Sequence, residues 1–177
     1  MIVKLGNPIL RETTRTLALS EIGSPSIVKT VETMSRALRN TEDGIGIAAP
    51  QIGVSLKIFL ASEEALKMET KETKTEVEQK EMKRRWKYYV FINPKILKYS
   101  KKHAVLTEGC LSVPGLYGTV KRSEKVKIEA YDQHGKKFQM GASGLFSRLL
   151  QHEVDHLNGI LFIDKAEKVV KIPHENK

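Results

Sequence analysis

The most informative stretch of this 177-residue chain is Gln151-His152-Glu153-Val154-Asp155-His156, a His-Glu-x-x-His pattern inside a segment with helical periodicity. Histidines four residues apart lie one turn from each other on the same face of a helix. Two neutral imidazoles placed in this way can bind one metal ion, and the glutamate between them can act as a base on water that the metal activates. The pattern therefore predicts metal-assisted hydrolysis.

The residues around this pattern indicate that the histidine face of the helix is buried. The two histidines continue an apolar stripe, with spacings of four, three and four, that consists of Leu145, Leu149, His152 and His156. Buried imidazoles need partners for their nitrogen atoms, and a metal ion is such a partner. Histidines that only cap or pack are the alternative. We expect Ser143 to be the N-cap of this helix and Gly159 to end it.

A catalytic site of this type usually takes three protein ligands and leaves one position for water, so a third ligand is needed. The chain offers its only cysteine, Cys110, or an acidic residue after the helix such as Glu175. Cys110 stands between Gly109 and a Ser-Val-Pro-Gly segment that we expect to be a turn, where a thiolate can be aimed at the metal. Glu175 is two residues from the last residue, where chains usually fray. Cys110 is the preferred ligand, although a single cysteine often serves only as a small apolar side chain.

Three segments of the chain are informative both in their sequences and in the order in which they occur. They are Gly44-Ile45-Gly46-Ile47-Ala48-Ala49-Pro50-Gln51, Glu108-Gly109-Cys110-Leu111-Ser112 and Gln151-His152-Glu153-Val154-Asp155-His156-Leu157-Asn158-Gly159. Together they resemble the three signature motifs of peptide deformylases, and the opening residues 5–11 are also similar to that family. The resemblance covers most of the chain except residues 62–88 and the tail after Asp164. It implies an enzyme that removes the formyl group from the N-terminal formylmethionine of new polypeptides and releases formate.

The resemblance also implies roles for individual residues. It assigns the donors for the oxyanion to the side-chain amide of Gln51 and the backbone N–H of Leu111. Glu153 is turned about 60–100° around the helix from the histidines, so it can reach the water and serve as general base, then as acid to the departing amine. Main-chain groups of Ile45 and Gly109 would pair with the peptide, and the glycines Gly44 and Gly46 would let it approach. Leu145 and Leu149 would line the methionine pocket, or else be ordinary core leucines.

The ligand set leaves the metal open. One thiolate and two imidazoles accommodate one divalent ion of zinc, iron or cobalt. The resemblance suggests Fe(II) as the native ion, with Zn, Ni or Co as substitutes.

Length and composition favour one cytoplasmic domain over residues 1–177. A chain of this length with 40% hydrophobic residues can bury a proper core. Its single cysteine excludes an internal disulfide, and no stretch is long and apolar enough for a membrane span. We expect a monomer that acts on N-formylmethionyl nascent peptides. The net charge of +9 indicates either attraction to a polyanion such as the ribosome or general solubility.

The periodicity of the remaining chain predicts an α+β fold, with antiparallel strands around the central metal-binding helix and a second helix near the N-terminus. That second helix should start at Ser24-Pro25 and bury a stripe of Ile27, Val31, Met34 and Leu38. Strands are predicted at 57–61, 89–93 and 126–131, with a hairpin turn at 132–135 leading to a further strand. Strands with one helix at each end argue against a doubly wound sheet.

A charged segment at about 62–88 interrupts this pattern. Residues 63–87 contain seven Glu, eight Lys or Arg and neither Gly nor Pro, and their apolar residues lack a period. We interpret the segment as a solvated insertion, helical or partly disordered, that is longer than the family usually has here. Tyr117 is a second departure, because many relatives carry an arginine there. The short tail after Asp164 argues against docking on the ribosome by a C-terminal helix.

Two other functions fit parts of the sequence. A metallopeptidase of the zincin type would use the same helix but would take its third ligand downstream instead of Cys110. A basic RNA- or ribosome-binding module with a structural metal would not need Glu153, and its binding would weaken steeply with salt.

Overall fold

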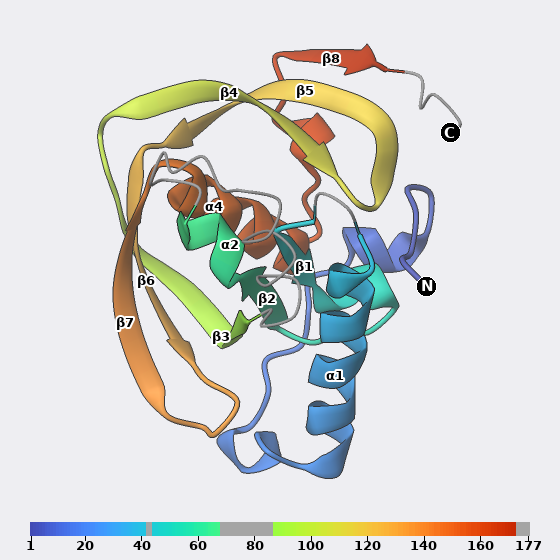
Figure 1. The fold of residues 1–177 in the computed structure, drawn as a ribbon, viewed down its shortest axis with the longest axis vertical. Helices are drawn as coiled ribbons and strands as arrows, with labels where there is room; N and C mark the ends of the chain where they lie inside the picture. The colour runs from blue at the N-terminus through green and yellow to red at the C-terminus, as the bar shows by residue number, and fades with distance from the viewer. Residues whose placement is uncertain (42–43, 68–86, 173–177) are drawn as a thin grey trace, which may run out of the picture.

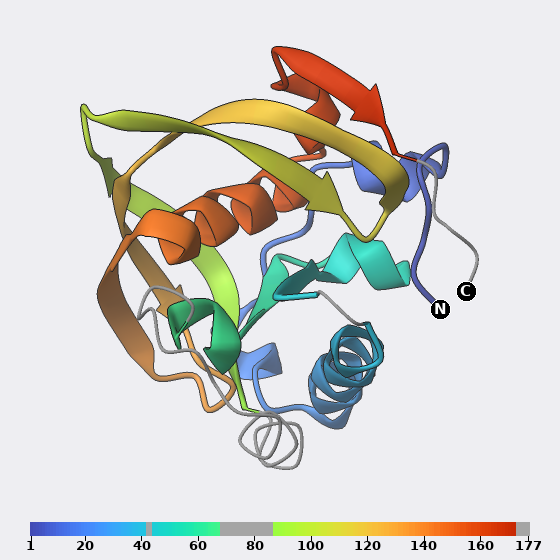
Figure 2. The ribbon, with the colours of Figure 1, turned by 45° about the horizontal axis from the view of Figure 1, so that its top comes forward.

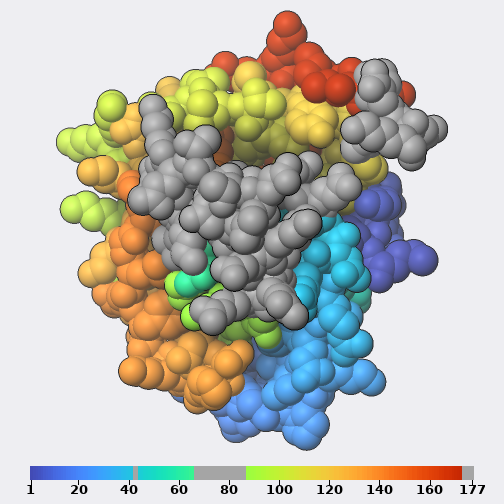
Figure 3. Space-filling model, in the orientation of Figure 1, coloured from blue at the N-terminus to red at the C-terminus, as the bar shows by residue number. Residues whose placement is uncertain are grey.

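The computed structural model describes residues 1–41, 44–67 and 87–172. It contains two antiparallel sheets with helix α4 (Gly144–Leu157) between them, while helix α1 (Pro25–Arg39) packs on the outer side of the larger sheet (Figures 1 and 2). In the space-filling view, α1 lies at the lower right and the last strand of the larger sheet at the left (Figure 3). The predicted α+β class, with a central helix and an N-terminal helix, is confirmed.

The larger sheet has five strands in the order β1-β2-β3-β6-β7, and the smaller has three in the order β4-β5-β8. Their bounds are β1 Gly46–Ala48, β2 Ile58–Ser62, β3 Tyr88–Tyr99, β4 His103–Cys110, β5 Val113–Ser123, β6 Lys125–Tyr131, β7 Lys137–Ser143 and β8 Lys168–Lys171. Within the described ranges there are also the short helix α2, Glu63–Lys67, and four short 3-10 helices, η1 Pro8–Arg11, η2 Leu19–Glu21, η3 Ala49–Ile52 and η4 Phe162–Asp164.

The larger sheet is buried on both faces where the two long helices cover it. Along β2, Phe59 and Ala61 face the α4 side, whereas Ile58 and Leu60 face α1. This follows from the strand geometry, since successive side chains point to opposite faces. The four predicted inward residues of α1 are buried, which confirms the stripe of Ile27, Val31, Met34 and Leu38. No helix among the described residues is both long and apolar enough to cross a membrane.

The three predicted strands are present as β2, β3 and β6, although β3 extends well beyond the predicted 89–93. The hairpin turn at 132–135 is also present. There the Asp132 carboxylate accepts hydrogen bonds from the backbone N–H of His134 and Lys136, and Gly135 has a φ of 77°. This turn leads to β7, the predicted further strand.

The expected turn at Ser112-Val113-Pro114-Gly115 is wrong in position. The hairpin turns at Leu111 and Ser112, and β5 already begins at Val113. Glu108 pairs with Gly118 and Cys110 pairs with Val113. Between these two pairs the chain advances five residues along β5 but only two along β4. The surplus residues of β5 bulge out of the ladder, which lets Pro114 lie within a strand without removing a regular ladder hydrogen bond.

Helix α4 ends as predicted, with Gly159 in the left-handed region at a φ of 71°. A Cβ atom at this position would also collide with the backbone carbonyl of Arg11, the last residue of η1. Gly159→Ala should therefore destabilise the protein by at least about 2 kcal/mol, the sum of the left-handed backbone cost and the collision. Urea unfolding of the purified protein measures this.

Gly135→Ala is the matched control, because Gly135 has a φ of 77° but its added Cβ would meet nothing closer than 3.9 Å. The free energy of unfolding of Gly135→Ala should fall only by the cost of the left-handed backbone, about 1–2 kcal/mol. Equal losses for the two variants would show that contact between Gly159 and η1 does not matter.

The start of the charged segment belongs to the core. Ser62, at the end of β2, and Ala65, in α2, are both fully buried. The backbone N–H of Glu63 donates to the carbonyl of Lys87 over 2.9 Å, so the two ends of the segment lie side by side. The rest of the predicted insertion, residues 68–86, lies outside the described residues.

Candidate metal centre

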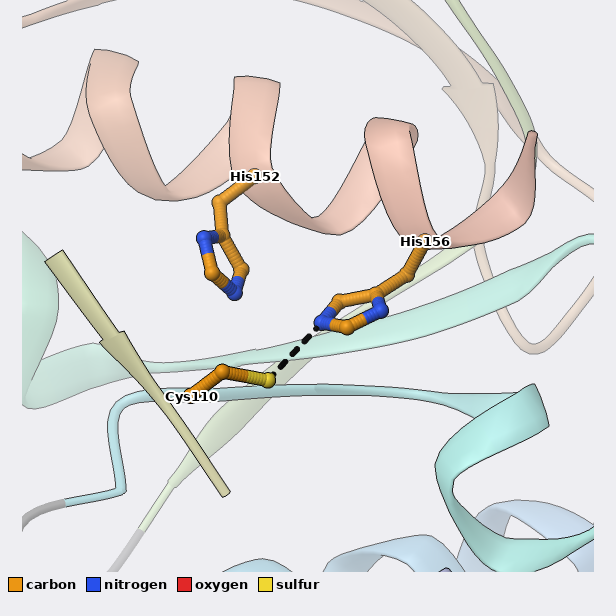
Figure 4. Close-up of side chains that lie close together, drawn as sticks. All are labelled: Cys110, His152 and His156. Atoms are coloured by element: carbon orange, nitrogen blue, oxygen red, sulfur yellow. Dashed lines mark hydrogen bonds between the residues drawn. The ribbon is translucent and has the colours of Figure 1, made fainter. Parts of the chain in front are cut away.

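Cys110, His152 and His156 come together between α4 and the tip of the β4–β5 hairpin (Figure 4). One ligand atom from each lies within 4.8 Å of the other two, and Cys110 Sγ is 3.2 Å from His156 Nε2. The two imidazole rings extend from one face of α4, with their centroids 4.9 Å apart. The structure therefore brings together the three ligands preferred from the sequence. Glu175 lies outside the described residues.

Helix α4 is buried on nearly all sides, so its polar side chains need partners within the protein. His152 Nδ1 lies 3.0 Å from Glu108 Oε2, which leaves Nε2 of His152 for the cluster. Such a carboxylate–histidine pair fixes the orientation of a metal-binding imidazole and raises its basicity. Glu108 is thus a positioning residue for His152.

Glu108 is itself held by two buried arginines. Arg122 binds both of its carboxylate oxygens, over 2.7 and 2.8 Å, and Arg148 Nη1 lies 2.6 Å from Oε1. Arg122 also binds Asp155 over 2.6 Å, and Asp155 in turn binds Lys165. The four buried charged residues of this network, Glu108, Arg122, Arg148 and Asp155, are therefore all paired and hydrogen-bonded, which offsets the cost of removing their charges from water.

This network of ion pairs was not predicted from the sequence. Arg148 and Asp155 are charged residues on an otherwise buried helix, four residues before and three after His152, and this spacing could have identified them. Glu108 stands two residues from Cys110, but nothing local shows that it contacts a histidine 44 residues away. No sequence pattern around Arg122 indicates that it binds Glu108.

The environment gives each ionisable group a distinct charge state. Burial lowers the pKa of His156 well below its usual value, so its imidazole is neutral. Burial acts on His152 in the same direction, but its hydrogen bonds with Cys110 and Glu108 outweigh this and raise its pKa to about 10. Burial also opposes ionisation of Glu108, yet the hydrogen bonds from Arg122 and His152 hold its pKa below the usual range.

Glu153 lies beside the cluster rather than in it. It is 2% exposed, and its Oε2 atom has no hydrogen-bond partner among the described residues. Burial raises its pKa to about 7, close to the value that suits a general base at neutral pH. A Cβ atom on Gly46 would lie 2.6 Å from Glu153 Oε1. The glycine in β1 therefore makes room for this carboxylate.

The side chain of Gln51 points at the cluster from η3. Its Oε1 accepts a hydrogen bond from the backbone N–H of Ala48 over 2.8 Å, which orients the amide. Its Nε2 lies 3.5 Å from Cys110 Sγ and 3.2 Å from Ser112 Oγ. Gln51 thus presents a fixed donor next to the sulfur ligand.

A hollow of about 540 Å³ opens onto these groups. Cys110, His152, Glu153 and Gln51 line it, together with the sequence-predicted Leu111 and the six predicted substrate-binding residues Gly44, Ile45, Gly46, Gly109, Leu145 and Leu149. Tyr117 also lines it, and its ring would lie 2.9 Å from a Cβ atom on Gly109. Leu149 is both part of the α4 core cluster and a wall of the hollow. Of the predicted site residues, His156 alone is not in the lining, because it lies behind the cluster at 1% exposure.

The residues present fit a divalent metal ion. One thiolate and two imidazoles are a donor set of the kind that binds zinc or iron. The three ligand atoms lie within 4.8 Å of one another, and burial holds His156 in the neutral form that binds metals. A catalytic site also needs an open side, which the hollow provides.

The family model for polypeptide deformylase matches residues 1–171. The chain belongs to the peptide deformylase family. Its relatives include the chloroplastic peptide deformylase 1A of Solanum lycopersicum, 42% identical over 93% of this chain, and the peptide deformylase of Carboxydothermus hydrogenoformans, 37% identical over 96% of this chain and 95% of its own. A Met-Ala-Ser-bound peptide deformylase from Acinetobacter baumannii superimposes with a TM-score of 0.76, at 30% identity, over 93% of this chain and 96% of that one.

This deformylase-family chain spans 58% of the length of the Solanum lycopersicum relative and 60% of that of the Arabidopsis thaliana peptide deformylase 1A, against 95% of the Carboxydothermus relative. The family match runs through all three motifs, and the sequence-based recognition of the family is confirmed.

Proposed function

We propose that the protein is a peptide deformylase that removes the formyl group from N-terminal formylmethionine. The observation that carries this proposal is the position of Glu153. It is a buried carboxylate without a partner among the described residues, and it stands in one hollow with Cys110, His152 and the Gln51 amide. A structural metal site would need neither this carboxylate nor an open hollow.

The groups of the hollow suit hydrolysis of a formamide. When bound, a divalent ion is a Lewis acid that can lower the pKa of water from 15.7 to about 7. Glu153 takes a proton from the attacking water, which adds to the formyl carbon, and then passes that proton to the amine as the C–N bond breaks and formate leaves. Gln51 Nε2 and the backbone N–H of Leu111 donate to the oxygen that becomes negative during the attack.

The same hollow offers a path for the peptide. Main-chain groups of Ile45 and Gly109 would pair with an extended substrate, and Gly44 and Gly46 let its backbone approach. Leu145 and Leu149 would then enclose the methionine side chain. The Acinetobacter relative was crystallised with Met-Ala-Ser, a peptide that begins with methionine.

We propose Fe(II) as the native ion, with Zn, Ni or Co as substitutes. Thiolate and imidazole ligands accept all of these ions, so ligand type alone does not select among them. Elemental analysis of protein purified without oxygen, from cells grown without added metal, identifies the ion. Zinc in stoichiometric amount and iron in trace amount would contradict this assignment.

Formate release from formyl-Met-Ala-Ser tests the proposed activity. We expect one formate for each new amino terminus, and no cleavage of the Met–Ala bond. Cleavage of unformylated Met-Ala-Ser would favour a zincin-type peptidase. Absence of both reactions in a protein with one bound metal ion per chain would favour a structural metal in a binding module.

Leu149→Ala tests the methionine pocket. Loss of side-chain contact should lower kcat/KM for a formyl-Met peptide by about 10- to 200-fold, the range for one pocket contact, and should affect a formyl-Ala peptide much less. Leu150→Ala is the matched control, because Leu150 is fully buried but does not line the hollow. It should reduce stability and leave the ratio of the two substrates unchanged. Equal losses on both substrates for Leu149→Ala would mean that this leucine only supports the helix.

We also propose that the protein works as a cytoplasmic monomer and meets nascent peptides at the ribosome. All the described groups of the site come from one chain, so a second copy is not needed to complete it. Its single cysteine suits a reducing compartment.

We propose a single domain over residues 1–177 in which residues 68–86 of the charged insertion are dispensable. Tyr88 pairs with Ser62 across β2 and β3, so a short Gly-Ser linker can replace residues 68–86. Formate release from the tripeptide should stay within about twofold of the intact chain, because dense charge with little apolar surface contributes little to a core. A deletion that begins at Glu64 is the control, since it also removes the buried Ala65 and should lower stability. A tenfold fall in kcat/KM for the first deletion, at equal metal content, would show that the segment shapes the site.

A further inference from the structure

The N-terminal segment, residues 3–5, is tied to two of the elements that build the metal centre. The backbone N–H of Val3 donates to the backbone carbonyl of Gln51, in η3, over 2.8 Å. The backbone N–H of Leu5 donates to the backbone carbonyl of Ser112, at the tip of the β4–β5 hairpin, over 2.7 Å. Residues 3–5 therefore connect η3 with the hairpin tip.

The side chain between these two anchors, that of Lys4, lines the hollow of the metal centre. Its Nζ donates to the backbone carbonyl oxygen of Leu111 over 2.8 Å. Within the described residues, no carboxylate forms an ion pair with Lys4, and its ammonium group binds this carbonyl instead. A positive charge is thus fixed next to the turn that follows Cys110, although the proposed hydrolysis gives Lys4 no role.

The peptide unit between Leu111 and Ser112 links Lys4 to the sulfur ligand. Its carbonyl oxygen accepts the hydrogen bond from Lys4, and its N–H, which belongs to Ser112, donates to Cys110 Sγ over 3.4 Å. This sulfur points toward the imidazole of His156 (Figure 4). A donor at the carbonyl polarises the amide and makes its N–H a stronger donor, because hydrogen bonds in a chain strengthen one another. The charge of Lys4 therefore acts on Sγ through one amide group.

Hydrogen bonds to a thiolate ligand tune how strongly its sulfur donates electrons to a metal. The side chain of Gln51 is a second donor to Cys110 Sγ, over 3.5 Å, but its amide is oriented by the backbone of Ala48. The Ser112 N–H is the donor that Lys4 strengthens. Outer partners of this kind change metal affinity or activity by about 10- to 100-fold. Because Lys4 is exposed to water, we expect its effect to be below that range.

We propose that Lys4 is a positioning residue that acts, through the Leu111–Ser112 peptide unit, on the thiolate of Cys110. Its ammonium group holds the turn after Cys110 and strengthens the hydrogen bond from the Ser112 N–H to Sγ. The sulfur then donates less electron density, which makes a metal ion held there a stronger Lewis acid. As far as turnover is concerned, this inference rests on the proposed function, but the state of the sulfur can be measured without it.

The first measurement needs no substrate. It is the thiolate-to-metal charge-transfer absorption of the cobalt-substituted protein. Lys4→Met keeps a long unbranched side chain without the donor, and its band should move to longer wavelength, because a less hydrogen-bonded sulfur gives up electrons more easily. Lys4→Arg keeps a cationic donor and should restore the band of the unaltered protein. Lys29→Met is the matched control, since it removes an exposed lysine of α1, and its band should not move.

The second measurement is turnover of formyl-Met-Ala-Ser at matched metal content. Lys4→Met should lower kcat about three- to tenfold, the effect of one solvent-accessible hydrogen bond from a charged group, and should change KM by less than about twofold. Lys4→Arg should recover most of this loss. The proposal is overturned by an unmoved band in Lys4→Met, by an equal shift in Lys29→Met, or by a raised KM at constant kcat, which would make Lys4 a contact of the peptide. A shifted band in a protein that releases no formate would support this inference and overturn the proposed activity.

Discussion

Glu153→Gln should retain its metal and lose at least about a hundredfold in turnover, the lower end of what a general acid–base contributes. Glutamine has nearly the same shape as glutamate, so the contact with Gly46 and the packing of α4 should persist. It cannot accept a proton from water or return one to the leaving amine. Because Glu153 lies beside the ligand cluster and not within it, its loss should not release the metal.

The measurement is kcat for formyl-Met-Ala-Ser at matched metal content. Glu153→Asp is a useful companion, because it keeps the carboxylate but withdraws it by one methylene, and its turnover should lie between the other two. Near-normal turnover by a fully metallated Glu153→Gln would contradict the assignment of this residue as the base. Loss of the metal together with the activity would instead make Glu153 part of the ligand set.

The clustering of Cys110, His152 and His156 could be predicted from the sequence because most of its geometry is local. The spacing of His152 and His156 places both rings on one face of a helix, whatever the rest of the fold does. Glu153 follows from the same periodicity. The position of Cys110 next to α4 could not be predicted from local periodicity, because it depends on a hairpin that no local pattern indicates. The order of the three family motifs supported Cys110 as a ligand instead.

The β4–β5 hairpin could not be predicted because its residues resemble a loop. Pro114, Gly115 and Gly118 suggest turns, yet they lie in a strand that bulges at its tip and pairs with β8 along its other edge. The bulge and this pairing are tertiary features. The same holds for the ion network of Glu108, in which the partners Arg122 and His152 are 14 and 44 residues away. Secondary-structure propensities depend on residues that are close in sequence, so they do not predict these long-range contacts.

The fold class was easier to predict from the sequence than the order in which the strands pair. Two helices with apolar stripes and three predicted strands, of which 126–131 alternates, were enough to indicate α+β, because the hydrophobic pattern of each segment is a local property. Strand order was not accessible in this way. Strand β6 pairs with β3 although the whole β4–β5 hairpin lies between them in sequence, and that hairpin belongs to the other sheet.

Cys110→Ala should lose its metal and, with it, all measurable deformylase activity. Cys110 Sγ is the only ligand atom of the cluster that does not come from α4, and it closes the site from the β4–β5 side. Its loss should weaken metal binding by more than the roughly 10- to 100-fold that removal of an outer partner costs. Metal content per chain after dialysis against a mild chelator, measured by elemental analysis, gives the result directly.

Two companion variants make this experiment decisive. Cys110→Ser keeps the size of the side chain but offers a harder oxygen ligand, so it should retain less metal than the unaltered protein and lose sensitivity to thiol oxidants. Glu175→Ala should keep both metal and activity, because the cluster is complete without that residue. Full metal content in Cys110→Ala together with metal loss in Glu175→Ala would reverse the assignment, since the downstream carboxylate would then be the third ligand, as in a zincin-type peptidase. If Cys110→Ala loses its metal and Glu175→Ala does not, the thiolate is a ligand. A thiolate bound to Fe(II) is easily oxidised, so air should inactivate the iron form faster than the zinc- or nickel-substituted form.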